Sequence, residues 1–324
     1  MESRKEKLRF GILSTASIVP RLIQAVQELP DVTVDAIASR DSDKAKSWAE
    51  KWDILKYYGS YEDLLADPEI DAVYVAMLNS KHYEYSKKAL EAGKHVLCEK
   101  PFTLLAKEAE ELFDLAKEKG LFLMEAQKSV FLPVNVRVKE LLEEGKIGEV
   151  YMADFSSSFL ATYDDWMGDP AQGGGPLTCS TCYMVHLARF LLGEPVTGAN
   201  ALCTMAQSRV DEQCSVNLSI ANKILVNTRI TTKVNTDHRA ILYGTKGQIE
   251  IPSYWKTRKA IVTLADGTKE MLDYPCEHEL QYEVAHFCQC MSQNLTESPV
   301  MTREMTVSTV KIVETLRKNN ILKD

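Results

Sequence analysis

The chain has 324 residues, with 46 acidic and 38 basic side chains and a formal net charge of −8 at pH 7. This acidic balance argues against nucleic acid or an anionic membrane surface as the main partner. The sequence begins with the charged stretch MESRKEK rather than an apolar signal segment. It also has no apolar run of the roughly 18 residues that a membrane helix needs. We therefore expect a cytoplasmic globular protein, long enough for two domains.

The first 125 residues alternate short apolar segments with amphipathic ones. Buried strands are predicted over residues 8–13, 32–38, 72–77, 96–98 and 121–125. Helices are predicted before Leu29 and over residues 44–52, 81–92 and 107–119. Continuous apolar strands separated by amphipathic helices predict an α/β fold with a doubly wound parallel sheet.

The pattern changes after about residue 150. Strand-like segments with alternating polarity cover residues 150–158, 214–220, 224–231, 239–243, 248–251 and 260–264, which predicts a largely antiparallel sheet. A helix over 183–192 interrupts them, and helices over 281–293 and 302–318 close the chain. We expect one domain over residues 1–125 and a second over residues 126–324, with the last helices packing back toward the first.

The segment from Leu8 to Val19 has the strand–turn–helix order of a dinucleotide fingerprint, but not its glycines. The three glycine positions hold Ser14, Ala16 and Val19, and the first two are still small enough for a pyrophosphate to approach the backbone. A purely structural turn is the alternative. The predicted cofactor contacts in this loop are Ser14, Thr15, Ala16, Ser17 and Ile18.

The end of the second strand favours NADP(H) over NAD(H). NAD enzymes place an acidic residue there, whereas this chain has Ser39 and Arg40, a hydroxyl and a guanidinium suited to a 2′-phosphate. An exposed arginine at a strand end is the alternative. Asn79 and His82 follow the next strand, where loop side chains can face the nicotinamide ribose. His82 is equally well explained as a residue at a helix N-terminus.

The sequence Cys98-Glu99-Lys100-Pro101 closes a predicted strand at the edge where α/β sheets bind ligands. Proline fixes its own φ and lacks a backbone donor, so we expect Lys100 to be held in one direction. Such a lysine can polarise a carbonyl or shift the pKa of a hydroxyl. A surface turn with a solvated lysine is the alternative.

These features together resemble the glucose–fructose oxidoreductase/inositol dehydrogenase (Gfo/Idh/MocA) family over essentially the whole chain. The resemblance is carried by AVYVAMLNSKHYEYSKKALEAGKHVLCEKPF (residues 72–102), LFLMEA (121–126) and GGGPLTCSTCYMVHLARFLLG (173–193). Finer features, such as Ser14 and the sequence Gly244-Thr245-Lys246-Gly247, are similar to the dimeric dihydrodiol dehydrogenase branch.

The resemblance implies a Rossmann domain and a second α/β domain with an open-faced sheet, which often forms a dimer interface. It places Glu99 and Lys100 in the family's Glu-Lys-Pro motif, close to hydride transfer. It places Tyr183 at the position of the branch's proposed acid–base tyrosine, for which a core tyrosine at the start of an apolar helix is the alternative. A small-molecule substrate, a homodimer or larger homo-oligomer, and no nucleic-acid or membrane partner are the partners expected.

Two departures from the family pattern bear on activity. Cys179 stands where the family usually has an aspartate, and Lys128 and Val130 stand where related dehydrogenases carry an aromatic residue and an arginine. We therefore expect an NADP(H)-dependent oxidoreductase for a small polyol, sugar or related hydroxy or keto compound. An NADP-binding sensor that has lost hydride transfer is the alternative, and an enzyme that recycles a tightly held nucleotide is a second.

Three further side chains near Tyr183 allow more than one interpretation. Cys179 and Cys182 have CxxC spacing, but without a second CxxC or a pair of histidines nearby neither zinc binding nor redox activity is favoured. We expect buried, reduced thiols and no metal site. His186 lies one turn beyond Tyr183 and either faces the same cleft or is an interior histidine.

Overall fold

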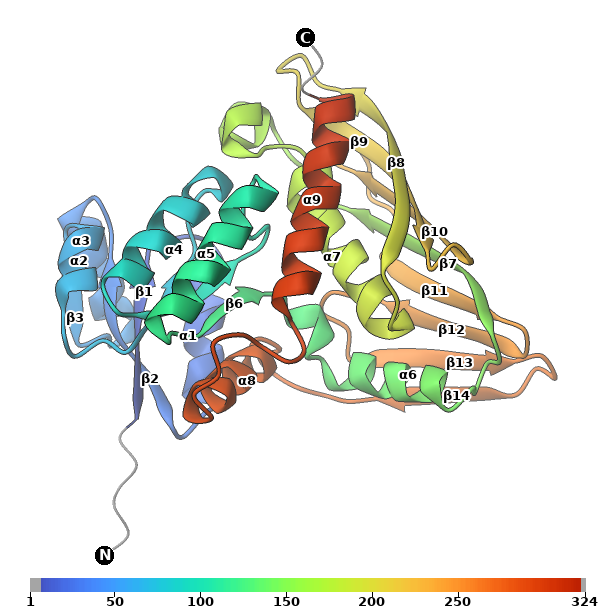
Figure 1. Cartoon of the computed structure of the whole chain (residues 1–324), viewed down its shortest axis with the longest axis horizontal. Coiled ribbons are helices and arrows are strands. Elements are labelled where there is room, and N and C mark those ends of the chain that lie inside the picture. Colours follow the sequence, from blue (N-terminus) through green and yellow to red (C-terminus); the bar gives the residue numbers. More distant parts are fainter. Residues whose placement is uncertain (1–6, 322–324) are drawn as a thin grey trace, which may run out of the picture. The chain divides into compact units, whose positions relative to one another are not determined.

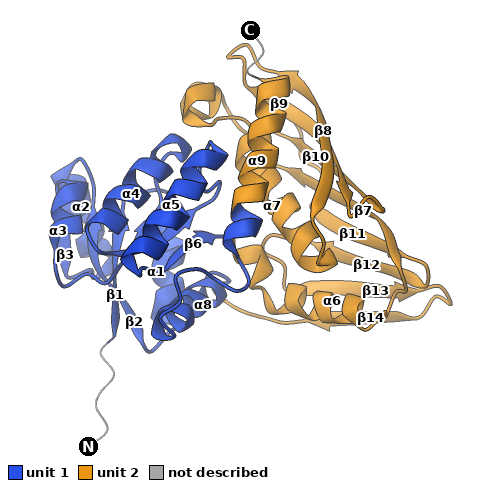
Figure 2. Ribbon diagram, viewed as in Figure 1, with its two compact units in different colours: residues 1–126, 278–306 blue, residues 127–277, 307–324 orange. Residues whose placement is uncertain are grey.

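The structure is a computed structural model that describes residues 7–321. It contains two compact units (Figure 2). Unit 1 comprises the described residues up to Ala126 together with His278–Thr306, and unit 2 comprises Gln127–Glu277 and the described residues from Val307 onward. That the chain folds as two domains with bounds 1–125 and 126–324 stays a prediction.

Unit 1 is built on a six-stranded parallel sheet with the order β3-β2-β1-β4-β5-β6 (Figure 1). This confirms the predicted Rossmann-type sheet. Its strands are β1 (Leu8–Leu13), β2 (Val32–Ala38), β3 (Lys56–Tyr58), β4 (Ala72–Val75), β5 (His95–Glu99) and β6 (Leu123–Ala126). The central strand β4 is buried at all of its positions, as its uninterrupted apolar sequence requires.

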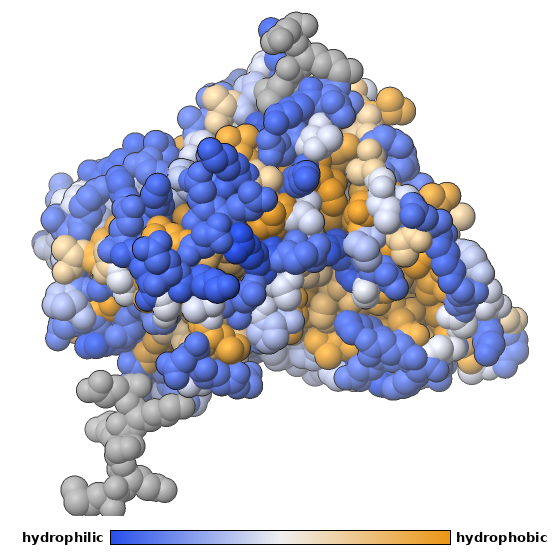
Figure 3. All heavy atoms as spheres, viewed as in Figure 1, coloured by the Kyte–Doolittle hydropathy of each residue, from blue (hydrophilic) through white to orange (hydrophobic). Residues whose placement is uncertain are grey.

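Two helices of unit 1 have ends that the sequence marks clearly. The helices of this unit are α1 (Val19–Gln27), α2 (Ser42–Trp52), α3 (Tyr61–Ala66), η1 (Asn79–Lys81), α4 (His82–Glu91), α5 (Ala106–Lys119) and α8 (Gln281–Ser292). The Asp41 carboxylate caps α2, and α5 stops at Gly120, whose φ of 66° suits a residue without a side chain. The outward faces of α4 and α5 are mainly hydrophilic in the view of Figure 3.

The segment after residue 277 completes unit 1 through aromatic packing. Phe287 of α8 packs against Phe10 of β1 and against Phe122, with ring centroids 5.3 and 5.0 Å apart. The backbone N–H of Leu123 donates to the carbonyl of Thr296 at 3.1 Å. The next helix, α9 (Arg303–Asn320), begins in unit 1 and ends in unit 2.

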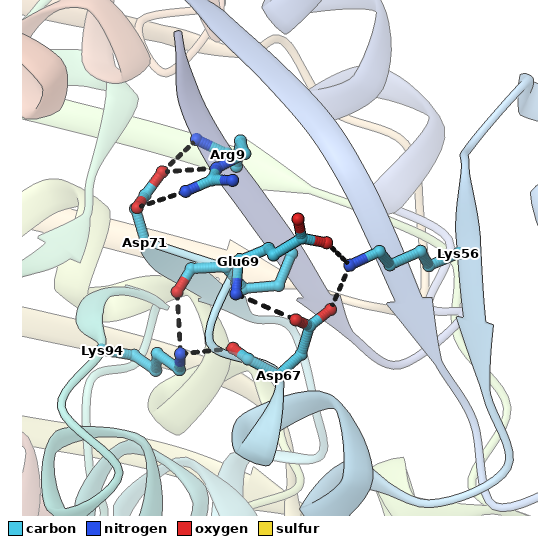
Figure 4. Close-up of polar contacts among 7 residues, drawn as sticks. Arg9, Lys56, Asp67, Glu69, Asp71 and Lys94 are labelled. Atoms are coloured by element: carbon cyan, nitrogen blue, oxygen red, sulfur yellow. Dashed lines mark hydrogen bonds and ion pairs between the residues drawn. The ribbon is translucent and has the colours of Figure 1, made fainter. Parts of the chain in front are cut away.

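A polar network ties together the amino ends of the strands in unit 1 (Figure 4). Arg9 of β1 binds the Asp71 carboxylate at 3.2 Å. The buried Lys94 ammonium donates to two backbone carbonyls, those of Asp67 and Ile70, at 2.6 and 2.8 Å. The Lys56 ammonium holds the pKa of Asp67 at about 2, against the opposing effect of burial. These contacts order the edge of the sheet opposite to the one that receives ligands in this fold.

Unit 2 contains an eight-stranded sheet with the order β14-β13-β12-β11-β7-β10-β9-β8. Only the β10–β7 pairing is parallel among the neighbouring strands, so the largely antiparallel sheet is confirmed. The strands are β7 (Val150–Ser158), β8 (Val196–Met205), β9 (Asp211–Ile220), β10 (Ile224–Thr231), β11 (Arg239–Gly244), β12 (Gly247–Pro252), β13 (Lys259–Leu264) and β14 (Lys269–Asp273).

One face of this sheet is covered by helix and the other is open. The helical elements are η2 (Lys128–Val130), α6 (Pro133–Glu143), η3 (Trp166–Gly168), η4 (Pro170–Gln172) and α7 (Pro176–Leu192). The long helix α7 contacts β9 and β10, and β10 accordingly alternates buried and exposed residues along its length. Across residues 7–321, no helix combines the length and apolar character needed to cross a membrane.

Candidate active site

The carboxyl edge of the unit 1 sheet gathers most of the residues predicted to bind a cofactor. In the observed strand order, β1–β3 and β4–β6 extend in opposite directions from the β1–β4 pair. This is the topological switch point at which doubly wound sheets bind nucleotides. The loops after β1, β2, β4 and β5 all leave the sheet at this edge.

The loop after β1 has the backbone of a glycine-rich turn without the glycines. Ser14 has a φ of 112°, a region that glycine adopts without strain. Its hydroxyl donates to the carbonyl of Ala76, beyond β4, and accepts from the N–H of Ala16 at 3.2 Å. These bonds hold a serine in a conformation that the dinucleotide fingerprint normally assigns to glycine.

The N–H groups of this loop are suited to a pyrophosphate. Among the described residues, no backbone carbonyl accepts from the N–H of Thr15, Ser17 or Ile18, which precede α1. Donors at a helix N-terminus form a ready anion site. The backbone of this loop therefore fits a dinucleotide, whereas Ile18 as N-cap offers no side-chain hydrogen bond to the helix.

The loop after β2 carries Ser39 and Arg40, the two residues predicted to bind a 2′-phosphate. Ser39 is buried and accepts from the N–H of Asp41 at 3.3 Å. Arg40 is exposed, and its guanidinium opposes the rise that burial causes in the pKa of Tyr61. The first carboxylate after the strand, Asp41, accepts from the N–H of Lys44 at 3.0 Å and so caps α2. That carboxylate is engaged in the fold, which leaves the guanidinium as the charged group at this strand end.

The turn after β5 is bound to its neighbours on both sides of Lys100. The Glu99 carboxylate accepts from the Tyr74 hydroxyl of β4 and from the N–H of Lys100, the latter at 3.2 Å. Lys100 is partly exposed, and its peptide bond to Pro101 is cis. Its ammonium is therefore carried by an ordered turn at the ligand edge of the sheet.

The two predicted residues after β4 are both buried. Asn79 is 7% exposed and begins η1. His82 is 1% exposed and contacts backbone carbonyls through both ring nitrogens, at 2.8 Å to Pro101 and 3.1 Å to Met77. Burial lowers the pKa of His82, which favours its neutral form. Their assignment as cofactor contacts stays a prediction.

Tyr183 lies in unit 2, on α7. The ammonium of Lys128, from η2, lies 5.9 Å from the centroid of the Tyr183 ring. Lys128 is 4% exposed, whereas Tyr183 is partly exposed. The buried cation of Lys128 thus faces the ring of the predicted acid–base tyrosine. Lys128 stands at the position where the family resemblance leads one to expect an aromatic side chain.

The other side chains that sequence analysis selected on α7 are interior. Cys179 is buried and its thiol donates to the carbonyl of Gly173 at 3.5 Å, while the buried thiol of Cys182 donates to the carbonyl of Cys179 at 3.8 Å. His186 is fully buried, and its Nδ1 atom lies 3.3 Å from the hydroxyl of Thr309 on α9. The packing of Cys179 shows that a small residue fits here, with no carboxylate at this position.

A buried carboxylate that sequence analysis did not select lies at the start of α7. Asp211 of β9 is fully buried and accepts from the N–H of Leu177 at 2.7 Å. Burial raises its pKa to about 7. A Cβ at Gly175 would overlap the Asp211 carboxylate, so the glycine run before α7 makes room for this cap. The glycine run was the available signal, because a helix start without a capping side chain needs a cap from elsewhere.

The fold and this loop edge define a nucleotide-binding protein of the Rossmann class. The profile of an oxidoreductase family with an NAD-binding Rossmann fold matches residues 8–127, and the GFO/IDH/MocA C-terminal domain matches residues 135–250. This chain belongs to the Gfo/Idh/MocA oxidoreductase family, as its sequence motifs predict.

Relatives and solved structures agree with this assignment. A trans-1,2-dihydrobenzene-1,2-diol dehydrogenase from Xenopus laevis is 33% identical over 309 residues, which cover 91% of this chain and 92% of that protein. The Mus musculus protein of the same name is 30% identical over 327 residues, with 96% of each chain covered. A 3-ketoreductase from Actinomadura kijaniata, solved with NADP and TDP-benzene, is 26% identical with a TM-score of 0.88 and covers 97% of this chain and 98% of its own.

Proposed function

We propose that this protein is an NADP(H)-dependent oxidoreductase that interconverts a hydroxyl and a carbonyl group on a small polyol, sugar or related compound. The observation that carries the proposal is the ordered Glu99-Lys100-Pro101 turn at the carboxyl edge of β5. It presents an ammonium at the edge where a Rossmann sheet receives its cofactor. NADP is bound in the related 3-ketoreductase, which supports the same cofactor here.

The residues of the nucleotide site have separate tasks. The N–H groups of Thr15, Ser17 and Ile18 would bind the pyrophosphate, and Ser14 would hold their loop against β4. Arg40 would pair with the 2′-phosphate, beside Ser39. Asn79, His82 and Glu99 would shape the nicotinamide end. The bound cofactor would supply the hydride acceptor or donor at nicotinamide C4.

The substrate chemistry then requires one group that binds the reacting oxygen of the substrate and another that carries its proton. In oxidation, the carbinol carbon loses a hydride and its hydroxyl loses a proton, which leaves a carbonyl. We assign the proton to Tyr183, and we assign to Lys100 the stabilisation of the negative charge on the reacting oxygen. In reduction, the phenol of Tyr183 returns the proton to the forming alkoxide.

The substrate class follows from the relatives and from two local changes. The named relatives act on a diol and, as a 3-ketoreductase, on a ketone, and both reactions exchange an alcohol with a carbonyl. Lys128 places a cation beside Tyr183, and Cys179 leaves out the aspartate of the family pattern. We therefore propose a polar hydroxy or keto compound rather than a dihydrobenzene diol.

The test is nicotinamide absorbance during incubation with NADP+ or NAD+ and a panel of aldoses, inositols and vicinal diols. Lys100→Met should lower kcat/KM by about 10²-fold or more, the scale of general acid–base and electrostatic contributions. Lys107→Met is the matched control, because the Lys107 side chain is 84% exposed on the surface of α5. Turnover that survives Lys100→Met would refute the assigned role.

A sensor that binds NADP without turnover is the second candidate, and Cys179 in place of the aspartate favours it. NADPH binding without turnover, across the whole panel and in both directions, would support the sensor. Cofactor that copurifies and resists dialysis would instead support internal recycling of a tightly held nucleotide. We also propose that the protein acts in the cytoplasm, as a homodimer formed through the open face of the unit 2 sheet.

A further inference from the structure

A buried histidine joins two loops at the ligand edge of the unit 1 sheet. His82 begins α4 and is 1% exposed. Its Nδ1 atom lies 2.8 Å from the carbonyl oxygen of Pro101, and its Nε2 atom lies 3.1 Å from the carbonyl oxygen of Met77. One imidazole ring therefore connects the loop after β4 to the turn after β5.

Only one of the two contacts of His82 can be a hydrogen bond when the ring is neutral. A carbonyl oxygen only accepts, so the ring nitrogen in each contact must carry a proton to form a hydrogen bond. A neutral imidazole carries one such proton, and burial favours the neutral ring. The shorter distance assigns the proton to Nδ1, so that His82 donates to Pro101.

The Pro101 carbonyl follows Lys100 directly along the chain. On the other side of Lys100, its own N–H donates to the Glu99 carboxylate at 3.2 Å, and Glu99 also accepts from the Tyr74 hydroxyl. The backbone is thus bound to a side chain before and after the lysine. Removal of the His82 contact would release one of these two restraints.

We propose that His82 is a positioning residue, which fixes the direction of Lys100 through its hydrogen bond to Pro101. The inference rests on the proposed function in one respect, because Lys100 is taken to act on the substrate. It differs from the cofactor contact predicted from sequence, since both ring nitrogens of His82 face backbone carbonyls.

Three substitutions of His82 distinguish the roles of its two ring nitrogens. The amide nitrogen of His82→Asn takes the place of Nδ1, and that of His82→Gln takes the place of Nε2, whereas His82→Phe keeps the ring volume without either donor. A misplacement of about 1 Å can cost about 10²-fold in rate. We expect His82→Phe and His82→Gln to lower kcat by at least about tenfold, with little change in the KM for NADPH. His82→Asn should recover most of the rate.

A second measurement needs no substrate. Amide hydrogen exchange in a peptide that covers residues 98–105 should accelerate in His82→Phe and return toward wild type in His82→Asn. His95→Phe is the matched control, because His95 accepts the N–H of Phe122 at 2.8 Å at the amino end of β5. This control should reduce stability without reducing kcat.

The outcomes test the positioning role of His82 separately from the proposed oxidoreductase function. Wild-type exchange and kcat in His82→Phe would overturn the positioning role, and so would recovery by His82→Gln rather than His82→Asn. Equal losses in all three variants would also overturn it, because the Pro101 contact would then be irrelevant. If wild type binds NADPH but turns over no substrate, the proposed function fails while the exchange comparison still decides the role of His82.

Discussion

Ser14 combines an unfavourable backbone conformation with two hydrogen bonds of its side chain. Its φ of 112° disfavours any residue with a Cβ, whereas its hydroxyl links the loop to Ala76 and Ala16. Ser14→Ala removes the hydroxyl and keeps the strain, while Ser14→Gly removes both. We expect Ser14→Gly to be more stable than Ser14→Ala by at least about 1 kcal/mol, measured by urea unfolding. Equal stabilities would show that the backbone at this position is not strained.

Arg40 decides the cofactor preference if the 2′-phosphate assignment holds. Hydrogen bonds to charged groups contribute about 1.5–3 kcal/mol, so Arg40→Ala should raise the Kd for NADPH by roughly 10- to 100-fold. The Kd for NADH should change by less than about threefold, because NADH has no 2′-phosphate. Fluorescence titration with both cofactors measures the difference. Equal losses for the two cofactors would contradict the assignment, and Arg40→Lys, which keeps the charge, should be intermediate.

Sequence reasoning could select residues that a local pattern marks, and it missed a residue whose partner is distant in the chain. The fingerprint loop at Ser14 and the Glu99-Lys100-Pro101 turn follow from adjacent residues. The cap of α7 joins Asp211 to the N–H of Leu177, which lies 34 positions away in the chain. No local pattern marks Asp211 as buried, because an Asp-Glu pair between apolar stretches is typical of a surface turn.

At the scale of elements, Asp211 makes the start of α7 sensitive to pH. Its pKa in the fold is about 7, above its ordinary value of 3.8. Between these values the unfolded chain ionises while the folded protein keeps its proton, so stability falls as pH rises and the loss is complete above about pH 7. Asp211→Asn cannot ionise and keeps an acceptor for Leu177.

The unfolding free energy of Asp211→Asn relative to wild type should therefore increase by roughly 1–3 kcal/mol from pH 5 to pH 8. Denaturant unfolding at both pH values measures this difference. Asp211→Ala also loses the cap, and it should be about 1 kcal/mol less stable than Asp211→Asn. If the unfolding free energies of Asp211→Asn and wild type differ by the same amount at both pH values, Asp211 does not titrate between pH 5 and pH 8.

The accuracy of the predicted elements depended on their burial. The predicted strands over residues 8–13 and 32–38 coincide with β1 and β2, because each ends in a buried apolar run inside a parallel sheet. Sequence analysis missed β8, whose residues are mostly exposed and lack an alternating pattern. It also missed β3, which has only three residues. Edge strands carry little of the hydrophobic signal on which such predictions depend.

At the scale of the whole molecule, the open face of the unit 2 sheet supports the proposed dimer. Leu225 of β10 is 58% exposed and pairs with Met152 of β7, which is 43% exposed. Met152 also pairs with Tyr243 of β11, and Leu202 of β8 is 77% exposed. Several strands thus contribute apolar side chains to one face, which is typical of a surface that binds a partner.

This arrangement predicts that a charge placed among these apolar side chains prevents self-association. Leu225→Asp should convert a species of twice the chain mass into one of a single chain mass, measured by light scattering coupled to size exclusion. The reason is that an unpaired carboxylate at an apolar interface loses its hydration without compensation. Leu160→Asp is the matched control, since Leu160 is 66% exposed but lies beyond the end of β7. A wild-type protein that runs at a single chain mass at micromolar concentration would contradict the dimer, and equal dissociation in both variants would place the interface elsewhere.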